Sequence, residues 1–102
     1  MYQLVFLGAA RQDMTDIVRY ISHELLNPTA ADALADEMIE AAERLCDHSY
    51  INAVHPTIKP LKHEYRKLLV KNYIMLYWVD EHEKLITIAR VIYARRDYEK
   101  RL

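Results

Sequence analysis

The spacing of hydrophobic residues divides the chain into one strand-like run, two helical segments and a strand-rich second half. The first run, Tyr2–Leu7, is short, apolar and made of residues that favour strands. After Gly8 the period changes, because hydrophobic residues then recur every three or four positions from Ala10 to Leu25, with charged residues between them. This spacing predicts an amphipathic helix of about four turns that buries one face.

A second helix is predicted to begin at Asn27-Pro28. Asparagine is a favoured N-cap, and proline is tolerated at the first helical position because its missing N–H would have no partner there. The apolar face of this helix is rich in alanine and extends to Leu45, while its outer face is acidic. Because only about two residues separate the two helices, they should form an antiparallel hairpin.

Two segments lack a hydrophobic period. Residues 47–64 contain two prolines and are predicted to form a long loop, which in a small domain is often functional or mobile. The charged tail, Ala94–Leu102, is expected to form at most one helical turn at the edge of the sheet.

Three strand-like runs lie in the second half of the chain. Asn72, a tight-turn residue that tolerates positive φ, separates the first two, and the acidic segment Asp80–Lys84 makes the next turn. Runs that follow one another so closely favour an antiparallel meander. The predicted strands are Tyr65–Lys71, Tyr73–Val79 and Leu85–Tyr93.

The order β-α-α-β-β-β predicts an α+β fold with a small antiparallel (mixed) sheet and the helical hairpin packed on one face. The other face would be open to solvent or to a ligand, as antiparallel sheets allow. The chain has 102 residues, 52% of them hydrophobic, which fits a single domain over residues 1–102. A single glycine and three prolines exclude fibrous and low-complexity classes.

The net charge of −1 argues by itself against a nucleic-acid partner, but the charge is unevenly distributed. Residues 1–54 carry a net charge of −6, and residues 55–102 carry a net charge of +5. This asymmetry indicates a face that meets an anionic partner, unless folding mixes the two halves and the bias has no function. Both interpretations are open at this point.

Cys46 is the only cysteine, which excludes an intrachain disulfide and a thiolate metal cluster. It occupies a helical apolar position and is expected to be an inert packing residue. The five histidines lack a metal-ligand spacing, so we expect neither a metal nor another cofactor. The N-terminal apolar run is too short to span a membrane and has no signal-peptide flank, so we expect a cytoplasmic protein without a membrane partner.

The candidate chemistry is a concentration of basic residues interleaved with aromatic ones, because no compact catalytic motif is present. Cations bind phosphates and aromatic faces stack on bases, so the pattern is typical of an RNA-binding surface. The basic residues lie in the long loop, in the first strand of the meander and at the C-terminal end: Lys59, Lys62, His63, Arg66, Lys67, Lys71, Arg90, Arg95, Arg96, Lys100 and Arg101.

The aromatic residues have a second interpretation, since tyrosine and tryptophan also fill strand cores. We favour core packing for Tyr77 and Trp78. For Tyr93 and Tyr98, which lie beside the basic residues of the tail, core packing and base stacking are both open.

Strand alternation places Arg66 and Lys67 on opposite sides of the first meander strand. Arg90 falls on an apolar side of the last strand, where an arginine must be paired or lie at the edge of the helical cover. Glu64 and Asp97 are the candidate partners, and a structural role for Arg90 is favoured over a functional one.

Four segments carry a family resemblance: AARQDMTDIVRYI, NPTAADALADEMIEAAERL, YRKLLVKNYIMLYWVD and ITIARVIYARRDYEKRL. Over nearly the whole chain the sequence resembles the RelE/ParE superfamily, the toxins of bacterial type II toxin–antitoxin modules that serve in plasmid stabilization. The resemblance implies a small sheet with a helical hairpin on one face, and a cognate antitoxin whose C-terminal segment wraps the toxin. RelE-like members cut mRNA in the ribosomal A site, whereas ParE-like members inhibit DNA gyrase by protein–protein binding.

The match to the RelE-like nuclease site is incomplete. Those nucleases usually place an arginine after a tyrosine of the middle meander strand, and here Ile74 follows Tyr73. Their basic pair on the preceding strand falls in part on Arg66, with Lys67 or Leu68 as the second member. The resemblance maps the tail arginine onto Arg95 or Arg96, with Tyr98 nearby.

The first hypothesis is therefore a growth-inhibiting toxin that acts as a metal-independent, ribosome-dependent endoribonuclease, an mRNA interferase. Such cleavage needs a base for the 2′-hydroxyl, a cation for the developing charge and an acid for the leaving oxygen. The candidate catalytic residues are His63, Arg66, Lys67, Arg96 and Tyr98, and the candidate RNA- or target-binding residues are Lys62, Lys71, Tyr93, Arg95 and Lys100.

The alternative is a ParE-like inhibitor of gyrase without nuclease activity, which the missing strand arginine favours. A third hypothesis is a degenerate member that is no longer toxic. The expected partners are a cognate antitoxin and either the ribosome with its mRNA or DNA gyrase. Exposed apolar surface predicts a homodimer when the antitoxin is absent.

Overall fold

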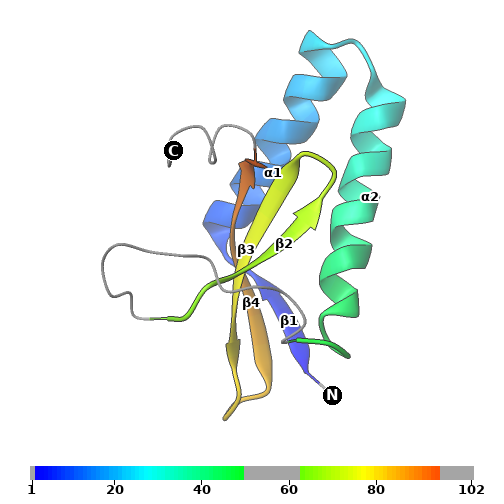
Figure 1. Cartoon of the computed structure of the whole chain (residues 1–102). Helices are drawn as coiled ribbons and strands as arrows, with labels where there is room; N and C mark the ends of the chain where they lie inside the picture. Colours follow the sequence, from blue (N-terminus) through cyan, green and yellow to red (C-terminus); the bar gives the residue numbers. More distant parts are fainter. Residues whose placement is uncertain (1, 50–62, 95–102) are drawn as a thin grey trace.

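The computed structural model describes residues 2–49 and 63–94 (Figure 1). Within these ranges four strands and two α-helices follow one another in the predicted order, and a π-helical turn, η1, extends the first helix. The elements are β1 (Gln3–Phe6), α1 (Gly8–Arg19), η1 (Tyr20–Glu24), α2 (Pro28–Arg44), β2 (Arg66–Val70), β3 (Tyr73–Asp80) and β4 (Leu85–Tyr93).

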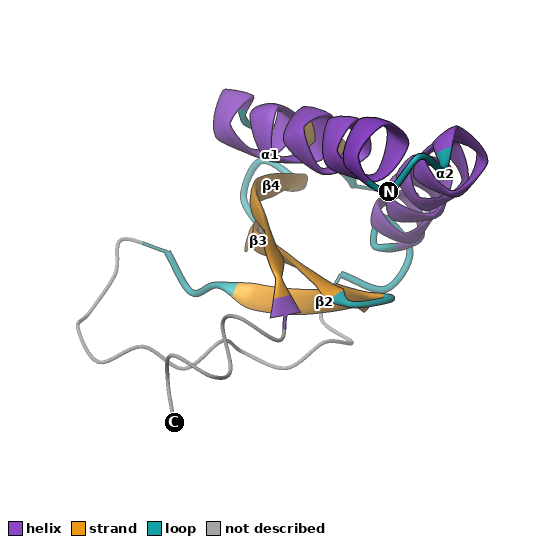
Figure 2. Cartoon of the chain, turned by 90° about the horizontal axis from the view of Figure 1, so that it is seen from above, coloured by secondary structure: helices purple, strands orange, loops and turns teal. Residues whose placement is uncertain are grey.

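The four strands form one mixed sheet in the order β1-β4-β3-β2. Strands β2, β3 and β4 are a continuous antiparallel meander, and β1 joins the sheet at the far edge by pairing parallel with β4. A parallel pair needs a long crossover, which the two helices provide. Both helices cover the same face of the sheet (Figure 2), so the predicted fold class is confirmed.

Helix α2 begins as its sequence predicts. The Asn27 side-chain oxygen accepts a hydrogen bond from the Ala30 backbone N–H at 3.1 Å, and Pro28 occupies the first turn. This cap satisfies one of the N–H groups that have no partner within the helix.

The first helix differs from the uniform α-helix that was predicted. It begins at Gly8 and changes at Tyr20 into the wider π turn, in which the Leu25 N–H donates to the Tyr20 carbonyl at 3.2 Å. Leu26 then takes a φ of 53°, and this left-handed residue lets the Asn27 N–H reach the Ile21 carbonyl at 3.1 Å. Helices usually place glycine at such a position, so the periodicity alone could not locate this end.

The turn between β2 and β3 lies at Lys71 and Asn72, where it was predicted. The positive φ, 55°, falls on Lys71 and not on Asn72, the residue that tolerates it better. Asn72 instead accepts a hydrogen bond at its carbonyl from the Ala94 N–H at 2.8 Å, which ties this turn to the end of β4. No end of a predicted strand differs from the observed one by more than one residue.

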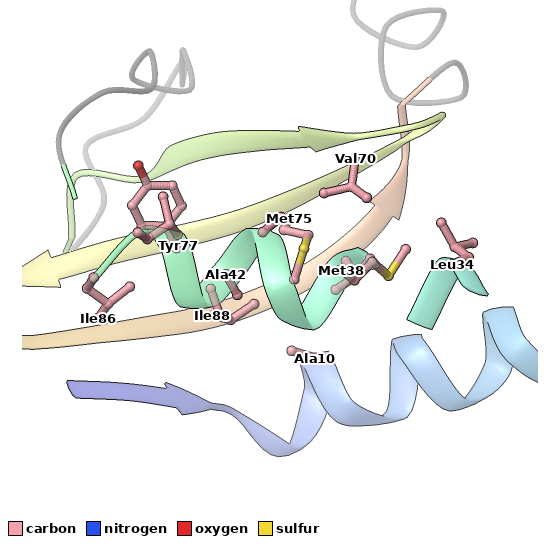
Figure 3. Packing of buried hydrophobic residues seen from close by; sticks show 12 residues of the cluster. Ala10, Leu34, Met38, Ala42, Val70, Met75, Tyr77, Ile86 and Ile88 are labelled. Carbon is pink, nitrogen blue, oxygen red and sulfur yellow. The ribbon is translucent and has the colours of Figure 1, made fainter. Parts of the chain in front are cut away.

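The core lies between the helix-covered face of the sheet and the two helices (Figure 3). Side chains from β2, β3 and β4 pack there against small and flexible residues of α1 and α2, and the alanines let the helices approach closely. Residues of this cluster include Ala10, Leu34, Met38, Ala42, Val70, Met75, Tyr77, Ile86 and Ile88.

Tyr77 is fully buried in this cluster, which confirms its predicted core position. Its hydroxyl donates a hydrogen bond to the Ser49 carbonyl at 2.9 Å and so fastens the chain after α2 to β3. Cys46 lies in the turn beyond the end of α2, not in the helix as predicted, and packs against the core. Burial, followed by the nearby Asp47 and Glu43 carboxylates, raises the pKa of its thiol, in keeping with an inert role.

One carboxylate closes the edge of β4 that β1 leaves uncovered. The parallel pairing ends at Phe6 and Ile88, and beyond it the Val91 N–H donates to the Asp13 carboxylate at 2.9 Å. The Arg90 guanidinium also donates to Asp13, from Nε at 2.7 Å and from Nη2 at 2.9 Å. Asp13 therefore holds α1 against β4 through three hydrogen bonds.

The partner of Arg90 was predicted wrongly. Glu64 pairs with Arg66 instead, and Asp97 lies outside the described residues. The physical reason is an irregularity in the β3–β4 register between Leu76 and Tyr77, where the pairing skips one residue of β4. This bulge changes the direction of the side chains that follow it, which simple alternation does not anticipate.

Replacement of Asp13 by asparagine should destabilise the fold by about 1–2 kcal/mol at neutral pH. Burial tends to raise the Asp13 pKa, but the hydrogen bonds from Arg90 and Val91 outweigh it and hold the pKa below its usual value of 3.8. The stabilisation is therefore complete above the unfolded carboxyl pKa and is lost as the pH falls through the lowered folded value. Chemical denaturation at pH values above and below the carboxyl pKa measures this loss of the free energy of unfolding.

Asp16→Asn, one turn further along α1, is the matched control. Asp16 is exposed and lies 3.9 Å from Arg19, a surface pair that contributes little. The difference between wild type and Asp13→Asn should be full at about pH 6 and should shrink below about pH 4. A difference that stays constant with pH, or equal effects of the two variants, would contradict the role of the Asp13 charge.

Tyr77→Phe should lower the free energy of unfolding by about 1–2 kcal/mol, because the buried Ser49 carbonyl would lose its hydrogen-bond donor. Tyr73→Phe, at a partly buried ring, is the control and should change stability by less than about 0.5 kcal/mol. Thermal unfolding followed by circular dichroism compares the two. Equal melting temperatures for both variants would show that the Tyr77 hydroxyl contributes nothing.

Candidate functional site

The structure describes five of the ten residues predicted to bind or cleave RNA, and they lie in three different places. His63, Arg66, Lys67, Lys71 and Tyr93 are described. The other five lie outside the described residues: Lys62, Arg95, Arg96, Tyr98 and Lys100.

Arg66 and Lys67 point to opposite faces of the sheet, as predicted. Arg66 lies across from the core residue Tyr77 and therefore faces the helical side, where its side chain is 17% exposed and donates to Glu64 at 3.1 Å. Lys67 lies across from Leu76 and faces away from the helices. The two cations therefore do not converge on one phosphate from the same side of the sheet.

The strand position that carries an arginine in RelE-like nucleases is here buried and apolar. Ile74 is fully buried on β3, across from Leu69 and Ile92. Lys71, at the turn before it, lies 3.9 Å from the Glu37 carboxylate of α2 and so sits on the helical side of the sheet. The middle strand of the meander contributes no cation to the open face.

Tyr93 lines a groove of about 1250 Å³ between the helical hairpin and the ends of β3 and β4. Its ring contacts the Tyr73 ring at a centroid distance of 5.5 Å, and Tyr20 of η1 lines the same groove with 54% of its surface exposed. Burial, followed by the neighbouring Tyr93 and Tyr20, raises the pKa of Tyr73 above its ordinary value.

The groove combines an apolar floor with a rim of both charges. Ile17 and Ile21 lie on its helical side, and the rim carries acids from the helices and the cations Lys71 and Arg90 from the sheet. Apolar and aromatic linings with a few polar groups are typical of sites that bind a protein segment. Tyr93 therefore belongs to this groove and not to a basic surface on the open face.

Trp78 does not lie in the core, so the prediction for this residue was wrong. It lies outside the core cluster, half-buried, on the face that the helices do not cover, and the His63 ring stacks on it at a centroid distance of 3.9 Å with the planes 1° apart. Tyr65 meets the Trp78 ring edge-on at 5.6 Å. Alternation with Tyr77 was the available signal, since adjacent strand residues cannot both face the core.

The described residues contain no group of three or more side chains suited to hold a metal ion. None of the helices in the described ranges is both long and apolar enough to cross a membrane.

The groove residue Tyr20 was not singled out from the sequence. It continues the apolar stripe of α1 at a three-residue step from Ile17, and the wider π turn directs it toward the groove. Only the three-residue step is visible in the sequence.

Comparison with solved structures shows the same fold in toxins of several bacteria. A chain of the chromosomal ParDE toxin–antitoxin system of P. aeruginosa is 21% identical, with a TM-score of 0.72 over 91% of this chain and 96% of that one. A chain of the RelBE2 toxin–antitoxin complex of Mycobacterium tuberculosis is 20% identical, with a TM-score of 0.62 over 90% and 96%. The isolated RelE toxin of E. coli is 17% identical, with a TM-score of 0.53 over 99% and 98%.

A search among curated proteins finds no match to this sequence. A family model described as the ParE toxin of the type II toxin-antitoxin system, parDE, matches residues 4–98 and thus covers nearly all of the sheet, both helices and most of the tail. The chain therefore belongs to the ParE toxin family of type II toxin–antitoxin systems.

Proposed function

We propose that this chain is a toxin that inhibits DNA gyrase by protein–protein contact and that a cognate antitoxin holds it inactive. The observation that carries the proposal is the separation of the described candidate residues. Arg66 and Lys67 face opposite sides, Lys71 pairs with Glu37, and Ile74 is buried where RelE-like nucleases have a cation.

A nuclease needs its base, cation and acid within reach of the same phosphate. Among the described residues these groups are not gathered, whereas the match to the ParE family spans residues 4–98. Binding of a protein target requires only a complementary surface and no converging catalytic groups. Both observations support the gyrase hypothesis over ribosome-dependent cleavage.

The groove is the surface that we propose for the antitoxin. Its aromatic and aliphatic lining suits the apolar face of an amphipathic segment, while its cations Lys71 and Arg90 already pair with Glu37 and Asp13. Solved structures with the same fold include a chain of the ParDE toxin–antitoxin system of P. aeruginosa and a chain of the RelBE2 toxin–antitoxin complex of Mycobacterium tuberculosis. These likenesses support an antitoxin partner for this chain.

The purified chain should inhibit supercoiling by gyrase at doses that leave mRNA intact in a translating extract. Expression should also induce the SOS response, because blocked gyrase damages DNA. Plasmid topology on agarose gels measures the first effect, and primer extension on a reporter mRNA measures cleavage at the A site. The antitoxin, added in equal amount, is the control and should restore supercoiling.

A-site cuts with unaffected supercoiling would replace the proposal with the RelE-like alternative. Growth that is unaffected by expression of a folded, soluble chain would contradict both activities and favour the degenerate toxin.

Tyr20→Glu should weaken binding of the antitoxin at least about tenfold, because a carboxylate would enter the apolar groove. Leu69→Glu, at an exposed residue on the face of β2 away from the helices, is the matched control. Calorimetric titration of each variant with the protein encoded beside this gene measures the affinity. Unchanged affinity for Tyr20→Glu would show that the antitoxin binds elsewhere.

A further inference from the structure

The tip of the helical hairpin exposes three large apolar side chains to solvent. Tyr20 in η1 and Leu25 just after it are each more than half exposed, and Leu26 is 81% exposed. The core cluster and the side chains packed against it include none of the three. We call these three residues the hairpin tip, and it lies at the opposite end of the molecule from the β3–β4 turn (Figure 1).

Leu26 also has a strained backbone. Its φ of 53° lies in the left-handed region, where the Cβ of a leucine crowds its own backbone and which glycine or asparagine adopts more easily. The hydrogen bond that this conformation allows, from the Asn27 N–H to the Ile21 carbonyl, needs no leucine side chain. Packing does not offset the strain either, because so little of the side chain is buried. A contact outside this chain therefore explains Leu26 better than the fold does.

The charges near the hairpin tip favour a protein partner over a phosphate-bearing one. Arg19 is the only lysine or arginine between residues 12 and 43, and its guanidinium lies 3.9 Å from the Asp16 carboxylate. Nucleic acids and anionic lipids are held by several cations together. Two exposed acids, Glu24 and Asp32, lie instead at the end of η1 and in the first turns of α2. The tip is therefore complementary to a protein surface with an apolar centre and basic residues at its edge.

The hairpin tip is continuous with the groove that we assign to the antitoxin. Tyr20 and Leu25 line the groove, whereas Leu26 is not among its lining residues. An antitoxin segment seated in the groove would therefore cover part of the tip. A protein bound to the tip would compete with the antitoxin without sharing all of its contacts.

We propose that the hairpin tip is the surface by which this toxin binds its protein target, and that the antitoxin blocks this contact from the groove. Leu26 enters an apolar patch of the target, and Leu25 and Tyr20 extend the contact. The inference rests on the proposed function, in which the toxin acts by protein–protein contact and the target is gyrase.

Replacement of Leu26 tests this inference, because a contact with the target and a role in the fold predict different results. Leu26→Gly removes the apolar side chain and relieves the backbone strain, so its melting temperature should equal or exceed that of the wild type. The concentration of purified chain that inhibits supercoiling by gyrase should rise at least about tenfold, and expression should no longer arrest growth. Leu26→Asn is the second variant and should behave alike, because asparagine tolerates the same φ but is polar.

Lys84→Gly is the matched control. Lys84 has the same φ of 53°, in the β3–β4 turn, so glycine relieves the same kind of strain at the opposite end of the molecule. This variant should inhibit gyrase and growth like the wild type. Calorimetric titration with the antitoxin is a further readout, and Leu26→Gly should keep the wild-type affinity because Leu26 lies outside the groove lining.

Full inhibition of gyrase by folded Leu26→Gly would overturn the inference and leave the proposed function intact. Growth arrest by the wild type without an effect on supercoiling would contradict gyrase as the target instead. In that case, loss of growth arrest in Leu26→Gly would still support the tip as the target contact, and its retention would overturn it.

Three further results would also overturn the inference. Lower melting temperatures of both Leu26 variants would assign this side chain to the fold. A wild-type dimer that Leu26→Gly dissociates in sedimentation experiments would assign the tip to a second copy of the chain. A wild type that does not arrest growth would contradict both the target contact and the proposed function.

Discussion

Side chains of neighbouring strand residues point to opposite faces of a sheet, and in this protein helices cover only one of those faces. This constraint separates the residues of β2 and β3 into two sets with different roles. Tyr77 enters the core and Trp78 faces away from it, although they are adjacent in sequence. Arg66 and Lys67 are divided in the same way, so the two cations of β2 do not share one face of the sheet.

The mixed topology adds a second constraint at the β4 edge. Strand β1 is short and covers only the first half of β4, so the backbone beyond Ile88 needs another partner. Asp13 supplies it and at the same time pairs with Arg90, so one carboxylate adds polar contacts between α1 and β4 to the apolar packing of α1. Because α1 and η1 form one wall of the groove, this contact also joins that wall to β4.

Local signals in the sequence were sufficient for the elements and the fold class. The Asn27-Pro28 cap, the three- and four-residue periods and the β-branched run of β4 each act within a few residues and appear as expected. Contacts that depend on register were not predictable. The irregularity between Leu76 and Tyr77 redirects Arg90 to Asp13, and the positive φ falls on Lys71 where asparagine was the better local candidate.

The candidate site was harder to predict, because composition does not show on which face of the sheet a residue lies. Tyr93 and Trp78 both belong to the aromatic residues interleaved with cations, yet one lines the groove on the helical side and the other lies on the open face. The groove on the helical side and the rings of His63, Tyr65 and Trp78 on the open face are surfaces of different chemistry. The groove is formed by the helices and the end of β4, whereas the three rings lie on the opposite side of β3, so the strand that joins the two surfaces sorts its aromatic residues by alternation.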